Sequence, residues 1–306
     1  MRNRLIGVIM VLFGSTLWGG SGTVAQRLFE DSGFQPGWLV TMRLLVSGIL
    51  LLLMQAMKTD IFRIWKKKRD GLQLILFGIL GMLAVQYTYF AAIDAGNAAT
   101  ATLLQYLGPA LITVYLALRF KRFPKVREIV AVILALLGTY FLVTDGSPQN
   151  LTISPAAIAW GLASAAALAF YTLNPENLLK EWGAGIVVGW GMLIGGIGLS
   201  FLYPPWQTSG QQWNVTTFSF VAFVILFGTL LAFFLYLESL KFIKPTETSL
   251  LACAEPLSAA IVAILWLHVP FGLYQMIGGL CILATVVLLS LKEKRQVKVE
   301  CNKEVL

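Results

Sequence analysis

A carboxyl group inside a hydrophobic stretch is the feature of this chain with the clearest capacity for chemistry. Glu255 lies in the apolar run 246–267, and Pro256 follows it directly. A carboxylate in the hydrocarbon of a membrane is costly, so it is usually retained because a ligand or a proton binds there. A rise of ~1.5 Å per residue places Glu255 roughly 14 Å along the run, near the middle of a ~30 Å hydrocarbon core. Pro256 removes a helix hydrogen bond at this depth, which frees backbone groups to face a cavity.

Three roles stay open for Glu255. Burial disfavours the charged form of a carboxyl group, so Glu255 could take up and release a proton or bind part of a substrate. It could instead pair with Arg43, which lies some ~7 Å nearer the outer face by the same rise argument. In the third role it only bonds the backbone groups freed beside Pro256. Arg43 itself either reaches the outer lipid headgroups or faces the interior as an anion anchor or counter-charge.

The composition sets these two residues in a membrane protein. The chain has 306 residues, of which 58% are hydrophobic and 12% are charged, whereas soluble domains carry about 25% charged residues. The net charge of +8 does not indicate nucleic-acid binding, because the basic residues are arranged as topological signals. The three cysteines, Cys253, Cys281 and Cys301, fit no disulfide framework. We expect no cofactor and no metal site.

Ten apolar runs are long enough to span or nearly span a bilayer. The first is longer than the hydrophobic part of a signal peptide, so we expect an uncleaved first helix. The loops between the runs are too short for a separate soluble domain. The approximate limits of the runs are 5–28, 37–57, 72–93, 98–118, 127–144, 154–174, 184–203, 217–238, 246–267 and 271–291.

The basic residues predict how these helices are oriented, because Lys and Arg concentrate in cytoplasmic loops. With ten crossings, all but two of the 23 Lys and Arg residues fall on one side, and the exceptions are Arg27 and Arg43. The alternate loops 145–153 and 204–216 contain neither residue type. We therefore expect both termini in the cytoplasm, and the short loops favour the inner membrane of a bacterium.

The two halves of the chain repeat each other at a separation of 147 residues. The loop 119–127 carries five basic residues, and its counterpart 266–274 carries none. Each half holds five helices, an odd number, so the second half must enter the membrane from the opposite side. We expect a first repeat at 1–145, an inverted second repeat at 154–292 and a polar cytoplasmic tail at 293–306, the plan of secondary transporters. Matching pairs are Gly81 and Gly228, Tyr89 and Tyr236, and Pro109 and Pro256.

Several short motifs carry a family resemblance across nearly the whole chain. They are Leu17-Trp18-Gly19, Arg43, the stretch 97–102, Pro109 and Ala254-Glu255-Pro256. In the order, spacing and duplication of these motifs, the chain resembles the drug/metabolite transporter superfamily. The resemblance is to its ten-helix branch, whose members have two EamA-type domains. The resemblance implies movement of small metabolites, amino acids or amphipathic drugs, mostly by export, although some members exchange nucleotide sugars or phosphorylated metabolites. Many relatives have a Gly-Glu pair just after helices four and nine. This chain has the basic stretch 119–122 and Leu267-His268 there, so the role of that glutamate does not carry over.

Helical spacing selects the residues that would line a cavity between the halves. Aromatic walls with a few hydrogen-bonding groups suit small amphipathic molecules. For Trp18 and Tyr89, packing is the alternative role. Tryptophan and tyrosine near helix ends are usually interfacial, which we expect of Trp38, Tyr203, Trp206 and Trp213. The expected cavity residues are Trp18, Gly22, Gln86, Tyr89, Gln105, Tyr106, Tyr171, Asn174, Tyr236 and Cys253, with Glu255 and Arg43 as charge candidates and Pro109 and Pro256 as helix breaks.

These features favour a secondary transporter that works by alternating access and exports a small metabolite or an amphipathic compound, amino-acid-like or drug-like. Proton coupling is one option for it. The chain has no P-loop of the form GxxxxGK[ST], which argues against direct coupling to ATP. The alternatives are an intramembrane enzyme acting on lipid and a channel. The expected partners are the lipid bilayer and a small-molecule substrate, not nucleic acid, and both a monomer and a homodimer stay open.

Overall fold

The computed structural model of the chain describes residues 2–121, 123–147, 152–243, 248 and 251–290. Every regular element in these ranges is helical. A lipid environment offers no hydrogen bonds to the backbone, so long apolar runs must satisfy their own N–H and C=O groups, as helices do. The predicted all-helical membrane fold is confirmed. The start of the ninth predicted run, the predicted tail and Cys301 lie outside the described residues.

The helices follow the ten predicted runs, several of them in pieces. The elements of the first half are α1 (Arg2–Ser32), α2 (Pro36–Ala56), η1 (Arg63–Lys66), α3 (Lys68–Leu76), η2 (Phe77–Leu83), α4 (Ala84–Ala95), α5 (Ala98–Gln105), α6 (Gly108–Arg119) and α7 (Val126–Thr144). Those of the second half are α8 (Pro155–Leu173), α9 (Glu176–Trp182), α10 (Ala184–Ser200), α11 (Val215–Ala222), η3 (Phe223–Leu231), α12 (Ala232–Ser239), α14 (Ala254–Trp266) and α15 (Leu273–Ser290).

Among the described residues, seven helical stretches are long and apolar enough to cross a membrane, and three shorter apolar helices complete the ten predicted runs. The first helix ends at Ser32, four residues beyond the predicted limit. Two pairs at i,i+4 spacing support this extra turn. Gln26 Nε2 donates to Glu30 Oε1 at 2.8 Å, and Arg27 forms an ion pair with Asp31.

The fourth span is broken within the membrane, and so is the ninth. Turns at Tyr106 and Leu107 separate α5 from α6, and turns at Ala252 and Cys253 precede α14. The observed breaks therefore lie two to four residues before the two prolines at which they were predicted. Both prolines lie in the first turn of the following helix, where a missing N–H leaves no hydrogen bond unmade. The third span of each half contains a π-helical segment, η2 and η3, which the sequence analysis did not predict.

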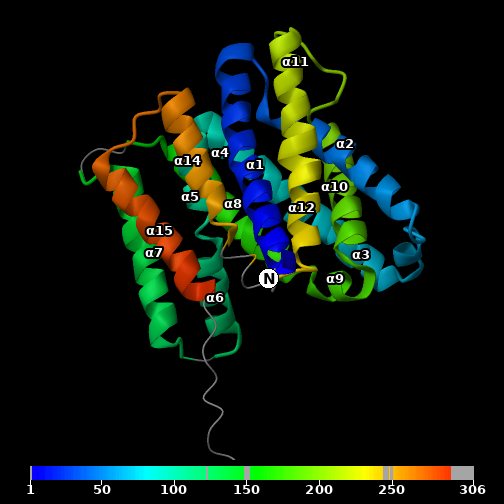
Figure 1. Cartoon of the computed structure of the whole chain (residues 1–306), viewed down its shortest axis with the longest axis horizontal. Coiled ribbons are helices and arrows are strands. Elements are labelled where there is room, and N and C mark those ends of the chain that lie inside the picture. Colours follow the sequence, from blue (N-terminus) through cyan, green and yellow to red (C-terminus); the bar gives the residue numbers. More distant parts are fainter. Residues whose placement is uncertain (1, 122, 148–151, 244–247, 249–250, 291–306) are drawn as a thin grey trace, which may run out of the picture.

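Helices of the two halves pair with their own counterparts. The second helices of each half, α2 and α10, pack together, and the fifth helices, α7 and α15, do the same. These two pairs lie on opposite sides of the molecule (Figure 1). Between them, α1 packs against α12 and α14, and α4 packs against α8. The halves are thus interleaved rather than side by side.

Glycines bring the paired helices to backbone contact. A Cβ added at Gly138 of α7 would lie 2.8 Å from the Gly278 carbonyl oxygen of α15, and one added at Gly278 would lie 2.6 Å from the Gly138 oxygen. Small residues allow helices to pack closely in a bilayer, where no hydrophobic force drives them together. In the same way, α10 approaches α2, with a Cβ at Gly48 meeting the Leu193 nitrogen at 2.8 Å.

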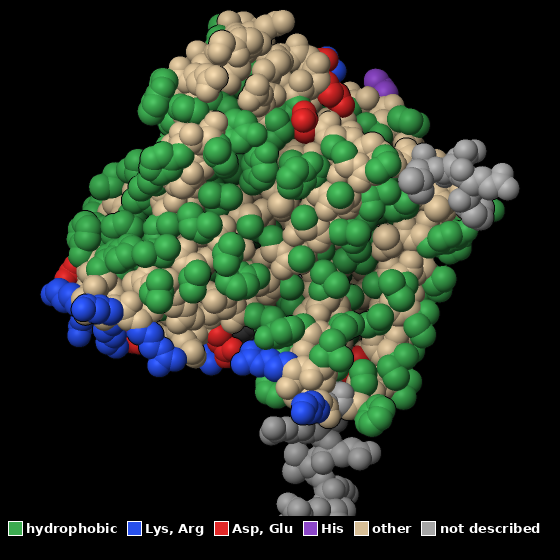
Figure 2. All heavy atoms as spheres, turned by 180° about the vertical axis from the view of Figure 1, so that it is seen from behind, with side chains coloured by type: hydrophobic (Ala, Val, Ile, Leu, Met, Phe, Trp, Pro, Cys, Tyr) green, Lys and Arg blue, Asp and Glu red, His purple; other side chains and the backbone are tan. Residues whose placement is uncertain are grey.

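Charge is distributed unevenly along the molecule. Figure 2 shows Lys and Arg side chains gathered along the lower edge, with a hydrophobic band above them. Ion pairs lie at this end, one within α9 and one between α9 and the residue that precedes α3. Lys180 contacts Glu176 at 2.6 Å, which lowers the pKa of that carboxyl, and a hydrogen bond to Glu181 raises the pKa of Lys67. This distribution fits the predicted cytoplasmic side, although the orientation in the membrane remains a prediction.

Candidate functional site

A cavity of about 540 Å³ lies between the two halves. Most of the predicted site residues border it. Its lining reaches Thr172, Leu237 and Leu289 near the ends of α8, α12 and α15, so it extends toward the end of the molecule that carries the basic side chains. The predicted residues on its wall are Trp18, Arg43, Gln86, Tyr89, Gln105, Tyr106, Pro109, Tyr171, Tyr236 and Glu255.

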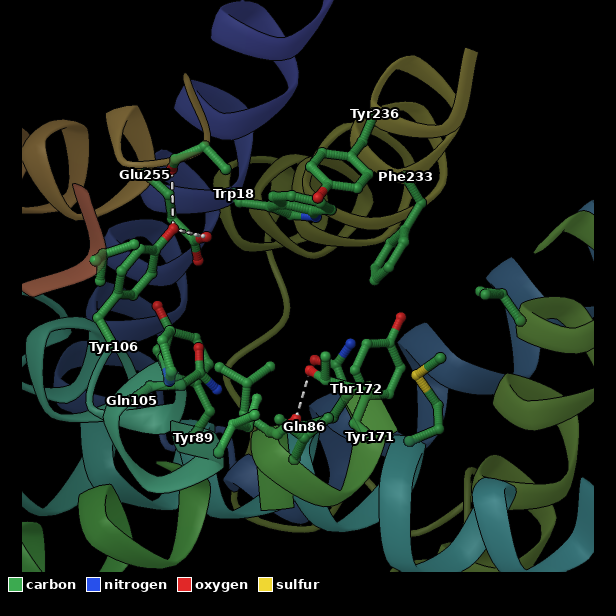
Figure 3. Close-up of a pocket in the computed structure, with 18 of the residues that line it drawn as sticks. Trp18, Gln86, Tyr89, Gln105, Tyr106, Tyr171, Thr172, Phe233, Tyr236 and Glu255 are labelled. Carbon is green, nitrogen blue, oxygen red and sulfur yellow. Dashed lines mark hydrogen bonds between the residues drawn. The ribbon is translucent and has the colours of Figure 1, made fainter. Parts of the chain in front are cut away.

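Aromatic rings from both halves form much of the cavity wall. Trp18 packs edge-on against Phe233, with ring centroids 5.0 Å apart, and lies 5.3 Å from the ring of Tyr236. Figure 3 shows these three rings on one side of an open space, with Gln86 and Tyr171 across from them. Phe233 was missed by sequence reasoning. The repeat could have found it, since 147 residues separate it from Gln86.

Glu255 lies in the first turn of α14, where the helix dipole favours a negative charge. The Tyr106 hydroxyl, from the other half, is 3.1 Å from Glu255 Oε2 and 2.8 Å from the Ala252 carbonyl oxygen. Figure 3 shows the two side chains meeting at the edge of the cavity. The phenol can donate a hydrogen bond to either oxygen, so Tyr106 links the break in the fourth span to the break in the ninth.

Arg43 is buried, with 3% of its surface exposed, and therefore does not reach the headgroups. Its Nε donates to Thr229 Oγ1 at 2.9 Å, and one terminal nitrogen is 3.4 Å from the Gly228 carbonyl oxygen. The guanidinium carbon lies 4.5 Å from the centre of the Phe90 ring, a cation–π contact. None of the ion pairs among the described residues includes Arg43 or Glu255. The Arg43–Glu255 ion pair, one of the three roles considered for Glu255, is not formed, because hydrogen bonds to η3 hold the guanidinium. The two charges interact only at longer range.

Four predicted residues do not line the cavity. A Cβ at Gly22 would lie 2.6 Å from the Tyr89 hydroxyl, so this glycine makes room for that ring. Cys253 is buried at the helix break, and Pro256 is buried in the first turn of α14. Asn174 follows the last residue of α8 and accepts a hydrogen bond at its backbone oxygen.

A hydrogen bond of Gln105 joins the two halves at the cavity wall. Gln105 Nε2 donates to Ser164 Oγ at 2.7 Å, which ties α5 to α8 across the halves.

Trp38, expected among the interfacial residues, is instead 4% exposed, and its indole nitrogen donates to the Pro205 carbonyl oxygen at 3.0 Å. A segment between α10 and α11 covers it. Trp206 of that segment is 80% exposed, as an interfacial residue would be.

The cavity is separated from a second pocket by contacts of α1. A Cβ at Gly19 would lie 2.8 Å from the Ala259 nitrogen of α14, so the two backbones touch. One turn further along, the Tyr89 hydroxyl lies against α1 and within 2.8 Å of Thr102 Oγ1. One more turn along, Gln26 Oε1 accepts from the Ala98 nitrogen at 2.9 Å. The second pocket, of about 590 Å³, is lined by polar residues that include Gln26, Glu30, Asn97, Asp145, Thr152 and Gln275.

The described residues contain no group of three or more His, Cys, Asp or Glu side chains that could hold a metal ion. The side chains on the cavity wall are suited to binding. They provide aromatic surface for an apolar body, a guanidinium for an anion, and a carboxyl group that can bind a proton or a cation.

Comparisons with known proteins fit this geometry. The model of the EamA-like transporter family matches residues 5–144 and 155–291. An uncharacterized inner membrane transporter of Salmonella typhimurium, YicL, is 40% identical over 95% of this chain and 97% of its own length. The threonine/homoserine exporter RhtA of Escherichia coli is 24% identical over 85% of this chain and 82% of its own. A solved crystal structure with 17% identity superposes with a TM-score of 0.62, covering 94% of this chain and 96% of that one.

Proposed function

The chain belongs to the EamA-like transporter family, and on this premise we propose that it exports a small metabolite by alternating access, as a secondary transporter. It is a multi-pass membrane protein and a transporter, not an enzyme. Family membership supplies the class of activity. The direction of transport, the mechanism and the substrate are the proposal.

The observation that carries the proposal is a cavity between interleaved halves that contacts of α1 close at one end. A carrier needs a binding site near the midplane that is exposed to one side at a time. The same α1 borders the cavity at Trp18 and the second pocket at Gln26. A shift of α1 relative to α4, α5 and α14 would join the two spaces and let the opposite end close.

Glu255 is the proposed coupling group. It lines the cavity, lies beside a helix break and has no ion-pair partner among the described residues. Burial penalises the charged form, while the hydrogen bond of Tyr106, the positive charge of Arg43 and the N-terminal end of α14 favour it. Such a balance allows a proton to bind in one facing state and to leave in the other.

The proposed substrate is an amino-acid-like or amphipathic compound. The cavity combines aromatic rings with amide and hydroxyl groups, which suits a molecule that has an apolar body and a polar end. A volume of about 540 Å³ lies within the range of small-molecule sites, which is ~300–1,000 Å³. RhtA, a more distant relative, is named for the export of threonine and homoserine, so these two are the first compounds to test.

Counterflow in proteoliposomes tests the proposal. Vesicles are loaded with an unlabelled amino acid and diluted into buffer that contains the same amino acid in labelled form. Threonine and homoserine are tested first, and each other amino acid follows in turn. A carrier concentrates the label transiently and saturates as the outside concentration rises. Label that only equilibrates, without saturation, would indicate a channel and contradict alternating access.

The proposed orientation places both termini and the basic end in the cytoplasm. Single cysteines at Lys67, which is exposed at the basic end, and at Trp206, which is exposed at the other end, test it in a Cys-free background. An impermeant thiol reagent applied to intact bacteria should label position 206 and not 67. Labelling of position 67 alone would show that the orientation is the reverse of the proposed one. The distribution of basic residues would then no longer support the inverted arrangement of the two repeats.

A further inference from the structure

Arg43 is a buried cation that forms no ion pair among the described residues, and it borders the cavity. We propose that its guanidinium binds a carboxylate of the transported compound, so that the substrate carries an anionic group. This inference rests on the proposed function, because it names the chemistry of what occupies the same cavity. It goes further by assigning the recognition of one substrate group to one residue.

The hydrogen-bond partners of Arg43 are neutral, and Glu255 acts on it only through space. A guanidinium has five N–H donors, and the hydrogen bonds found for Arg43 go to a hydroxyl and a backbone carbonyl, both neutral. The ion pairs of the described residues do not include it. Removing a cation from water is costly unless an opposite charge is provided. A carboxylate matches the planar fork of Arg with two parallel hydrogen bonds, and the cavity gives it access.

The guanidinium is held in place from behind. Thr229 Oγ1, which accepts from Arg43, itself donates to the Val224 carbonyl oxygen at 2.9 Å within the π-helical segment η3. π-Helical segments are rare and frequent at functional sites. A Cβ at Gly228 would overlap Ser21 of α1, so η3 and α1 are locked together there. Three neighbours, Thr229, Gly228 and Phe90, therefore fix the cation before any ligand arrives.

The contact between Arg43 and Thr229 has no counterpart at the repeat-related positions. The repeat places Met82 opposite Thr229 and Trp190 opposite Arg43. An ordinary packing role would not require a charge, since both repeat-related positions carry apolar side chains. Glu255 lies on the wall of the same cavity without touching Arg43. A ligand with a carboxylate at Arg43 can therefore present a second polar group to Glu255, as the ammonium of an amino acid would.

A first test uses the unmodified protein. The purified transporter is titrated with matched pairs, each L-amino acid with its amide and benzoate with benzamide, and binding is followed as a shift in thermal unfolding. At least one carboxylate should bind about 30-fold or more tightly than its amide, as expected for loss of one member of a buried charge pair. Equal binding within every pair, or no binding by any carboxylate, would overturn the proposal. Tighter binding of a panel of phosphomonoesters would also overturn it.

Variants locate the effect. Arg43→Gln should bind the carboxylate and the amide equally, with the affinity for the amide unchanged. Arg27→Gln is the matched control, because Arg27 is exposed and paired with Asp31, and it should keep the preference for the carboxylate. If Arg43→Gln does not fold, Thr229→Val keeps the cation and removes its positioning hydroxyl, and it should reduce the preference several-fold. A preference that survives both changes would exclude Arg43 as the anchor.

The two sets of experiments distinguish failure of the Arg43 anchor from failure of the proposed transport function. Carboxylate-selective binding that depends on Arg43, combined with no counterflow, would refute transport by this route and leave the anchor standing. Saturable counterflow of a compound without an anionic group would refute the anchor and leave the carrier standing.

Discussion

The break in the fourth span falls at Tyr106 and Leu107, and the break in the ninth falls at Ala252 and Cys253. Each is followed by a half-helix that starts beside the cavity with a proline in its first turn. The first break places a phenol there, whereas the second places the carboxyl group of Glu255. The repeat position of Glu255 in the first half is Gly108. The duplicated backbone thus supplies two equivalent sites, and the difference between Gly108 and Glu255 gives only the second of them a carboxyl group.

The two breaks also pack differently on their neighbours. Behind the second break, α14 touches α1, where a Cβ at Gly19 would meet backbone atoms of Glu255 and Ala259. At the first, a Cβ at Gly108 of α6 would meet the Leu168 side chain of α8 at 3.0 Å and the Ala165 carbonyl oxygen at 3.3 Å. The contact at the second break is the tighter one. We therefore expect it to tolerate less change.

The largest effect is expected from Gly19→Ala. Its methyl group would overlap backbone atoms of α14, which cannot move aside as a flexible side chain can. Overpacking of this kind costs typically ~1–3 kcal/mol, and we expect the upper end. Gly20→Ala is the matched control, since a Cβ there meets nothing within 4 Å. Thermal unfolding of the two purified variants measures the difference, and equal stability would show that α1 is not fixed against the second break.

A smaller effect, on binding alone, is expected from Trp18→Ala. The ring packs against Phe233 and Tyr236 on the cavity wall, and its loss should weaken substrate binding by ~1–3 kcal/mol without loss of expression. Trp160→Ala is the control, because Trp160 lies outside the cavity lining, edge-on to Tyr87. Tyr89→Ala should weaken binding similarly. Unchanged affinity in Trp18→Ala and Tyr89→Ala would leave both as packing residues.

The smallest effect is expected from Tyr106→Phe, which removes the hydroxyl that joins the two breaks. Its loss leaves Glu255 and the Ala252 carbonyl oxygen without this donor, at a cost of about 1 kcal/mol in unfolding free energy. Tyr140→Phe on α7, where the ring is 42% exposed, should cost less than half of that. Identical costs in the two variants would mean that the phenol does not connect the halves.

Much of this architecture could be predicted from the sequence. Ten helices and two repeats follow from hydropathy and the 147-residue separation. Glu255 and Arg43 were found because charge in hydrocarbon is costly and therefore informative. The π-helical segments could not be predicted, because their residues are as apolar as those of any span. The true partners of Arg43 could not be predicted either, since Thr229 belongs to a span of the other half, 186 residues away. Hydrogen-bond partners at such a separation are set by tertiary packing.

The most direct test of the account is Glu255→Gln in proteoliposomes, with a transmembrane pH gradient as the only driving force. Glutamine keeps the shape and hydrogen-bonding capacity of the side chain but cannot ionise, so the second break becomes as neutral as the first. The account predicts that pH-driven transport is lost, while exchange of substrate for substrate can continue. Full pH-driven transport by Glu255→Gln would contradict it and leave Glu255 with a structural role beside Pro256.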